Sequence, residues 1–235
     1  MKKILYALTI LFTILACGDA ITENTMIVSG HVKGLKKGTL YLQHISDTTL
    51  VIVDSLEIDG DGNYNFQTEL ESPEIFYLYL DKKDENNFND RITFFAEPGT
   101  ITIDTSWDDF ERNAEITGAE INTKLIAYRK YMSNFDRKNL ELVQHVNNSE
   151  TPLDSIQIDS IQVLNERNTK RAYLFAINYA LTNKDSYIAP YIAINEIPNT
   201  NIKYLDSIHN SLTTDVANSK YGIELKKLIT EIKSN

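Results

Sequence analysis

The sequence predicts an α+β fold, in which an N-terminal antiparallel β-sandwich-like domain is followed by a C-terminal helical segment. Two observations lead to this prediction. Up to about Gly118, short alternating or β-branched runs are separated by turn residues, which is typical of strands. Beyond Gly118, apolar residues recur at the period of an α-helix. Strands followed by helices along one chain indicate the α+β class.

The first segment of the chain has the pattern of a secretory signal. Two lysines precede a 13-residue apolar run that ends at Ala16. This run is too short to span a bilayer, which needs about 20 apolar residues. Ile14-Leu-Ala-Cys17 resembles the bacterial lipobox, and Cys17 is the only cysteine. We therefore predict a signal peptide over 1–16, lipid on Cys17 and a tether over 17–26; the alternative is an ordinary cleaved signal with an incidental cysteine.

Cleavage before Cys17 would remove 16 residues and two lysines, leaving 219 residues with a formal net charge of −12. Such an acidic chain would repel nucleic acid. No further cysteine is available for a disulfide, a zinc site or thiol chemistry. The only predicted membrane contact is the lipid. Because Gly18 rather than an inner-membrane retention aspartate follows Cys17, we expect the protein on the periplasmic face of the outer membrane.

The β-rich domain is predicted over 27–118, as an antiparallel meander that closes into a sandwich. Turn signals such as Asp59 to Asn63 and Pro98-Gly99 separate its strands. The strands are expected at Met26–Val32, Thr39–Ile45, Leu50–Ile58, Tyr64–Thr68, Ile75–Leu80, Arg91–Ala96 and Thr100–Asp104.

The helical domain is predicted over 119–235. Its clearest apolar stripe begins at Ile121, and shorter stripes follow further along the chain. The stripes comprise Ile121, Leu125, Tyr128, Met132 and Phe135, then Leu174, Ile177 and Leu181, and finally Leu225, Leu228, Ile229 and Ile232. Tyr173, Tyr179, Tyr187 and Tyr191 could line an aromatic ligand pocket, although such residues more often pack helix against helix.

Four stretches of the β half resemble a domain of unknown function, number 4369, found in lipoproteins of Bacteroidota. They are residues 29–35 with 38–42, 53–66, 94–103 and 116–122. In that family the domain usually precedes a thioredoxin-like domain of the thiol-disulfide interchange type. This chain has no Trp-Cys-x-x-Cys motif and ends at Asn235, where the thioredoxin domain would be expected. The resemblance therefore implies a fold and an envelope location, and it transfers no redox activity and no catalytic residue.

Other candidate sites are weak on their own. Asp59-Gly-Asp-Gly-Asn63 looks like half of a calcium loop, but the sixth and twelfth positions hold Tyr64 and Leu70 instead of glycine and glutamate. We interpret the stretch as a hairpin corner, and the alternative is a weak calcium site at its tip. The histidines His31, His44, His145 and His209 show no metal-ligand spacing, and we expect neither metal nor cofactor. Asp108-Asp109 beside Trp107 could line a sugar site, but adjacent carboxylates on an extended segment would point in opposite directions.

Asp-(Ser/Thr)-apolar or Asp-Thr-Thr triplets, which resemble the O-glycosylation signal of secreted Bacteroidota proteins, occur five times. Their hydroxyl residues are Thr48, Ser55, Ser155, Ser160 and Ser207. An alternative explanation of the triplets is that Asp and Ser are preferred helix N-cap residues. Ser55 lies in a predicted strand, where we expect it to be too buried for modification.

Three functions are compatible with these features. The first is a lipid-anchored, non-catalytic module that binds a partner in the periplasm. The second is an accessory of thiol-disulfide exchange that docks a separate thioredoxin-like protein. The third is a sugar-binding or hydrolytic lipoprotein that uses the Trp107 region.

Overall fold

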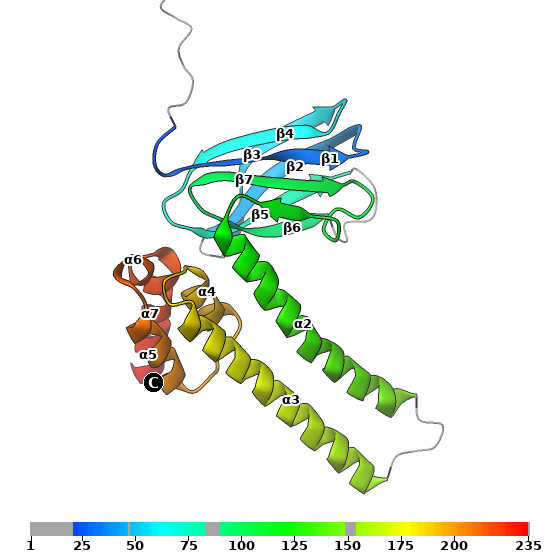
Figure 1. Ribbon diagram of the computed structural model, residues 1–235, viewed down its shortest axis with the longest axis vertical. Helices are drawn as coiled ribbons and strands as arrows, with labels where there is room; N and C mark the ends of the chain where they lie inside the picture. Colours follow the sequence, from blue (N-terminus) through cyan, green and yellow to red (C-terminus); the bar gives the residue numbers. More distant parts are fainter. Residues whose placement is uncertain (1–20, 47, 83–89, 149–153, 235) are drawn as a thin grey trace, which may run out of the picture.

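A computed structural model describes residues 21–46, 48–82, 90–148 and 154–234. The predicted signal peptide, Cys17 and the first part of the tether lie outside the described residues. The fold has the predicted α+β class, with a β-sandwich first and helices after it (Figure 1).

The β domain consists of two four-stranded sheets packed face to face (Figure 1). The first sheet has the order β4-β1-β7-β8, formed by Asn63–Glu69, Thr25–Lys33, Gly99–Ser106 and Glu115–Thr117. The second sheet has the order β3-β2-β5-β6, formed by Thr49–Asp59, Lys37–Ser46, Glu74–Asp81 and Arg91–Ala96.

The order of the strands differs from the predicted meander. β1 pairs in parallel with β7, with Val28 opposite Ile101, so the first sheet is mixed. The chain changes sheet between β1 and β2, between β3 and β4, between β4 and β5, and between β6 and β7. Local alternation marks which residues form strands, but the burial of two apolar faces against each other decides which strands pair. The three-residue strand β8 was not predicted.

The sandwich core is built from side chains that alternate along the strands. One face of each sheet points inward and is almost inaccessible to solvent. The inward set includes Val28, Phe66 and Ile101 from the first sheet, and Leu40, Leu78 and Phe94 from the second.

The sequence predicted that the corner at Asp59 to Asn63 closes a hairpin, and this prediction is wrong. β3 and β4 belong to different sheets, so this corner carries the chain from one sheet to the other. Gly62 has φ +77°, and an added Cβ would lie 2.3 Å from the Val32 carbonyl oxygen. Only glycine therefore fits this crossing without strain.

Two long helices form an antiparallel hairpin that points away from the β domain (Figure 1). They are α2 (Glu120–Asn147) and α3 (Ser155–Thr182). Four shorter helices pack around the C-terminal end of α3, and they lie beside the β domain (Figure 1). They are α4 (Ile188–Asn195), α5 (Ile202–Ser211), α6 (Thr214–Ala217) and α7 (Lys220–Ser234).

The predicted apolar stripe of α2 is confirmed near the β domain, where Ile121, Leu125 and Tyr128 are buried. The other stripes are confirmed only in part. Leu174 on α3 is 46% exposed and Ile232 on α7 is 39% exposed. Periodicity shows which face of a helix is apolar, but the neighbours available in the fold determine how much of that face is covered.

Helix α2 joins the sandwich at its edge, where it contacts the edge strands β6 and β8 of the two sheets. The Asn122 side-chain amide accepts a hydrogen bond from the Phe95 N–H (2.7 Å) and donates one to the Phe95 carbonyl (2.8 Å). Asn122 is 1% exposed, so it closes the free edge of β6 in place of a further strand. This contact fixes where α2 starts relative to the sheet.

Candidate binding site at the junction of the β domain and the helices

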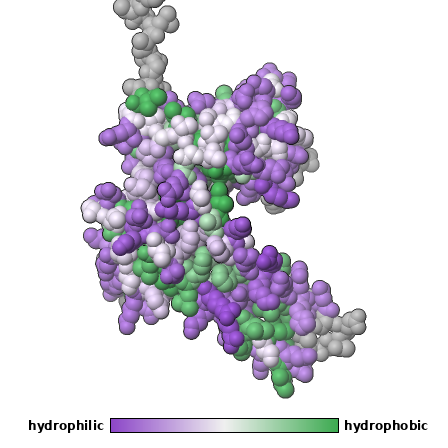
Figure 2. All heavy atoms as spheres, viewed as in Figure 1, coloured by the Kyte–Doolittle hydropathy of each residue, from purple (hydrophilic) through white to green (hydrophobic). Residues whose placement is uncertain are grey.

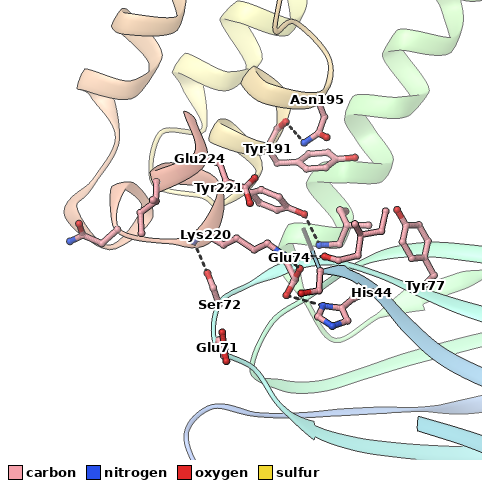
Figure 3. A pocket seen from close by; sticks show the side chains of 15 residues that line it. His44, Glu71, Ser72, Glu74, Tyr77, Tyr191, Asn195, Lys220, Tyr221 and Glu224 are labelled. Atoms are coloured by element: carbon pink, nitrogen blue, oxygen red, sulfur yellow. Dashed lines mark hydrogen bonds and ion pairs between the residues drawn. The ribbon is translucent and has the colours of Figure 1, made fainter. Parts of the chain in front are cut away.

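A cavity of about 570 Å³ lies where β5 and the end of β2 meet α4 and α7 (Figure 3). Its walls come from both halves of the chain and are rich in polar and aromatic side chains. The principal lining residues are His44, Glu71, Glu74, Tyr77, Tyr191, Asn195, Lys220, Tyr221 and Glu224. The volume is in the range of small-molecule sites.

An ion pair between Glu74 and Lys220 crosses the junction inside this cavity (Figure 3). Lys220 Nζ also donates to the Ile45 carbonyl at 3.2 Å, and His44 Nδ1 lies 3.2 Å from Glu74 Oε1. Glu74 is only 8% exposed. A carboxylate this buried requires partners, because an unpaired charge there would be strongly destabilising. The pair therefore holds the first turn of α7 against β5.

Three aromatic rings form the inner wall of the junction. Phe95, Tyr191 and Tyr221 have ring centroids 5.4–5.9 Å apart. The Tyr221 hydroxyl accepts a hydrogen bond from the Ile75 N–H at 3.0 Å. Burial raises the pKa of Tyr221 and that of Tyr191 above the ordinary value, so both phenols stay neutral at physiological pH.

The charges in the cavity favour a neutral or basic ligand. Three glutamates line it against one lysine, so an anion would be repelled on balance. His44 and Ser72 have the side-chain chemistry of a base and a nucleophile, but each already has other partners. The His44 ring stacks on Phe76 with centroids 5.0 Å apart and contacts Glu74. The Ser72 hydroxyl oxygen accepts a hydrogen bond from the Lys220 backbone N–H at 3.0 Å. These contacts hold His44 and Ser72 in place in the cavity wall.

Of the cavity residues, the sequence pointed to Tyr191 alone as a possible pocket residue. Glu74 lies 30 residues from His44 and 146 from Lys220, and no local motif connects them. The four tyrosines considered earlier do not share one pocket. Tyr191 lines the cavity, whereas the Tyr179 hydroxyl donates to the Lys124 carbonyl at 2.8 Å and ties α3 to α2. Helix packing is therefore the role of Tyr179.

The calcium-like stretch is a corner with internal hydrogen bonds. Asp61 accepts from the Asn63 backbone N–H (3.1 Å) and side-chain amide (2.7 Å), and these bonds lower its pKa. Tyr64 and Leu70, which break the calcium-loop pattern, are core residues. Within the described ranges, no group of three or more His, Cys, Asp or Glu side chains is placed to hold a metal ion.

The structure places a lysine side chain over the indole ring of Trp107. Lys82 Nζ lies 5.9 Å from the centroid of that ring, and Trp107 itself is 48% exposed. Asp108 and Asp109 lie in a bend and not on an extended segment. A hydrogen bond from Ser106 lowers the pKa of Asp108, and Asp109 pairs with Arg112 at 3.4 Å.

The structure exposes all five hydroxyl residues of the glycosylation triplets: Thr48, Ser55, Ser155, Ser160 and Ser207. The expected burial of Ser55 is wrong, because β3 is an edge strand and Ser55 is exposed on it. Asp154 is the N-cap of α3 and forms a capping box with Gln157. The helix-cap alternative is therefore confirmed at this triplet, and glycan occupancy remains a prediction.

Comparison with known families identifies the β domain. Residues 26–125 match the family described as "Domain of unknown function (DUF4369)". The chain therefore contains a domain of this family, which spans the sandwich and the first turns of α2. No curated protein and no solved structure matches the chain. Asn122, which bonds to the edge of β6, lies inside the matched region.

Proposed function

We propose that this chain is a non-catalytic binding module of the cell envelope, held at the periplasmic face of the outer membrane by lipid on Cys17. Its ligand or partner segment binds in the cavity at the junction of the β domain and the helices. The observation that supports this most directly is the 570 Å³ cavity with polar walls contributed by both domains.

The construction of the cavity supports binding rather than bond breaking. Its most buried charged groups, Glu74 and Lys220, neutralise each other and fix the walls. Its rim contains more exposed groups, including Glu71, Asn195 and Ile223. A rigid floor with an accessible rim suits recognition of a neutral or basic segment of a partner protein. No helix in the described part of the chain is long and apolar enough to cross a membrane.

The anchor is tested by labelling cells with radioactive palmitate. The full-length protein is expected to take up label and to sediment with the outer membrane. Cys17→Ser is expected to lose the label and to appear in the soluble fraction. Label on the Cys17→Ser protein, or an unlabelled wild-type protein, would overturn the proposed lipidation without affecting the cavity.

The cavity is tested by photo-cross-linking in the native membrane, with p-benzoylphenylalanine in place of Tyr77. The matched control carries the same group in place of Tyr131, which is 57% exposed on α2 and outside the cavity. We expect a discrete adduct from the Tyr77 position only. Asn195→Trp, which fills the cavity, should abolish that adduct, whereas Asn199→Trp in the α4–α5 turn should not.

The identity of the adduct then separates the remaining functions. A thioredoxin-like protein in the adduct would support the accessory role in thiol-disulfide exchange. Another envelope protein would support the general binding role. Equal adducts from the Tyr77 and Tyr131 positions, or an adduct unaffected by Asn195→Trp, would contradict binding in the cavity.

A further inference from the structure

The hairpin formed by α2 and α3 leaves many large apolar side chains exposed to solvent. Figure 2 shows hydrophobic side chains on its surface, up to the region near its tip. On α2, Val143 is 53% exposed and Val146 is 41% exposed. On α3, Ile158 is 50% exposed and Tyr173 is 37% exposed. The buried residues of α3 are confined to its C-terminal end, at Ala176, Ile177 and Ala180.

Much of this apolar surface forms one groove along α3. At the tip, a depression of about 320 Å³ is lined by Val143, Val146 and Ile158. Closer to the β domain, a depression of about 430 Å³ is lined by Tyr173 and by Tyr204 of α5. Asn165 lines both depressions, so they adjoin at the middle of the helix. Ile158, Gln162, Asn165, Thr169 and Tyr173 follow at helical spacing and form the floor of this α3 groove.

The charges beside the α3 groove are separated by sign along the helix. Every acidic residue from the N-cap onward precedes every basic one. The acidic residues are Asp154, Asp159 and Glu166, and the basic residues are Arg167, Lys170 and Arg171. Among the residues that the structure describes, Asp159, Lys170 and Arg171 have no ion-pair partner within the chain, and all three are exposed.

We propose that the occupant of the α3 groove is the α3 helix of a second copy, packed antiparallel around a two-fold axis beside Asn165. This dimer is independent of what the cavity binds. Antiparallel packing places the acidic half of each α3 against the basic half of the other, whereas parallel packing would place like charges together. With the axis between Asn165 and Glu166, Ile158 faces Tyr173 of the second copy, and Asp159 faces its Lys170–Arg171 pair.

The size of the hairpin suits such a dimer. Each helix has 28 residues. The C-terminal end of α3 is already buried, so roughly two thirds of this length is available. At 1.5 Å per residue and about 10 Å per helix diameter, this part of one hairpin face covers roughly 600 Å². This area is at the lower end of the range of a standard stable interface, which is roughly 600–1,000 Å² per partner. Four helices packed in this way would bury the apolar residues that line the α3 groove.

The absence of any cysteine after Cys17 makes a disulfide test direct. The mature chain carrying Cys17→Ser provides a lipid-free, cysteine-free background that contains all the residues described by the structure. Ile158→Cys and Tyr173→Cys are made in separate proteins, which are oxidised alone and as a mixture. Antiparallel packing predicts a disulfide-linked dimer only in the mixture. Strong cross-linking of either protein alone would show that like positions meet, and would overturn the antiparallel arrangement.

Sedimentation equilibrium of the Cys17→Ser chain tests the dimer itself and the role of charge. We expect a dimer at micromolar concentration. Arg171→Glu should raise the dimer dissociation constant at least tenfold, and the further change Asp159→Arg should restore it. Lys226→Glu on the exposed surface of α7 makes the same charge change away from the α3 groove and should alter the constant less than twofold. A monomer at 100 µM in ~0.15 M salt, or equal effects of Arg171→Glu and Lys226→Glu, would refute the proposal, provided that circular dichroism shows each chain folded.

Discussion

Replacing Asn122 by alanine should destabilise the junction between the β domain and the helices. The substitution removes two hydrogen bonds and leaves the N–H and the carbonyl of Phe95 buried without partners. Each unsatisfied buried backbone group costs about 1–3 kcal/mol. Part of this cost would be recovered where water reaches the cavity left by the amide. We therefore expect a loss of about 2–4 kcal/mol in the free energy of unfolding, equivalent to roughly 4–16 °C in melting temperature for a chain of this size.

The assay is urea unfolding of the Cys17→Ser mature chain, followed by far-ultraviolet circular dichroism. Asn134→Ala is the matched control, because Asn134 lies exposed on the same helix. Its side chain donates to the Lys130 carbonyl (3.2 Å) and accepts from Arg137 (2.9 Å), and both partners lie on the surface of α2 itself. Alanine is the better helix former, so this control should be neutral or slightly stabilising. If Asn122→Ala and Asn134→Ala differ by less than about 0.5 kcal/mol, the Phe95 bonds do not hold the junction and the reasoning is wrong.

Three further predictions concern buried tyrosines and the corner glycines. Tyr221→Phe should cost about 1–2 kcal/mol in the free energy of unfolding, because the Ile75 N–H loses its acceptor. Tyr128→Phe should be neutral or stabilising, because the buried Tyr128 hydroxyl has no hydrogen-bond partner among the described residues; urea unfolding compares the two variants. Burial raises the pKa of Tyr64, Tyr128 and Tyr221, so the neutral phenols stabilise the folded state fully below about pH 10, and this contribution is lost as the pH rises further. Tyrosinate absorbance should therefore appear together with unfolding during an alkaline titration, and titration of these tyrosines near pH 10 in the folded protein would contradict the burial argument. Gly62→Ala should be at least about 1–2 kcal/mol more destabilising than Gly60→Ala, because an added Cβ meets the Val32 carbonyl only at Gly62; equal melting temperatures would disprove the clash.

Much of the fold follows from patterns within a few residues. The alternation of Tyr64 and Phe66 with polar neighbours predicted β4, and the stripe that starts at Ile121 predicted the buried face of α2. Both patterns report the side of one element that must leave water, and this requirement does not depend on the partner. The strands from Met26 to Asp104 were located for this reason, while β8 was too short to show a period.

The candidate site could not be located in the same way. His44, Glu74 and Lys220 come from three distant segments, and each is an ordinary polar residue in its own neighbourhood. The ion pair between Glu74 and Lys220 forms only when α7 packs on β5. The calcium-like stretch shows the opposite error, because its three ligand-type side chains, Asp59, Asp61 and Asn63, lie in a corner whose conformation requires glycine at position 62.

The sequence by itself determined the α+β class, the family of the β domain and the faces that each strand and the start of α2 bury. These properties depend on the local period of apolar residues and on short turn motifs. The tertiary structure alone decided that β1 lies beside β7, that Asn122 closes the edge of β6, and that a cavity remains between the domains. It also decided that most of α3 stays uncovered. Pairing and coverage depend on which surfaces meet across the whole chain, because burial stabilises only where a complementary surface is in place.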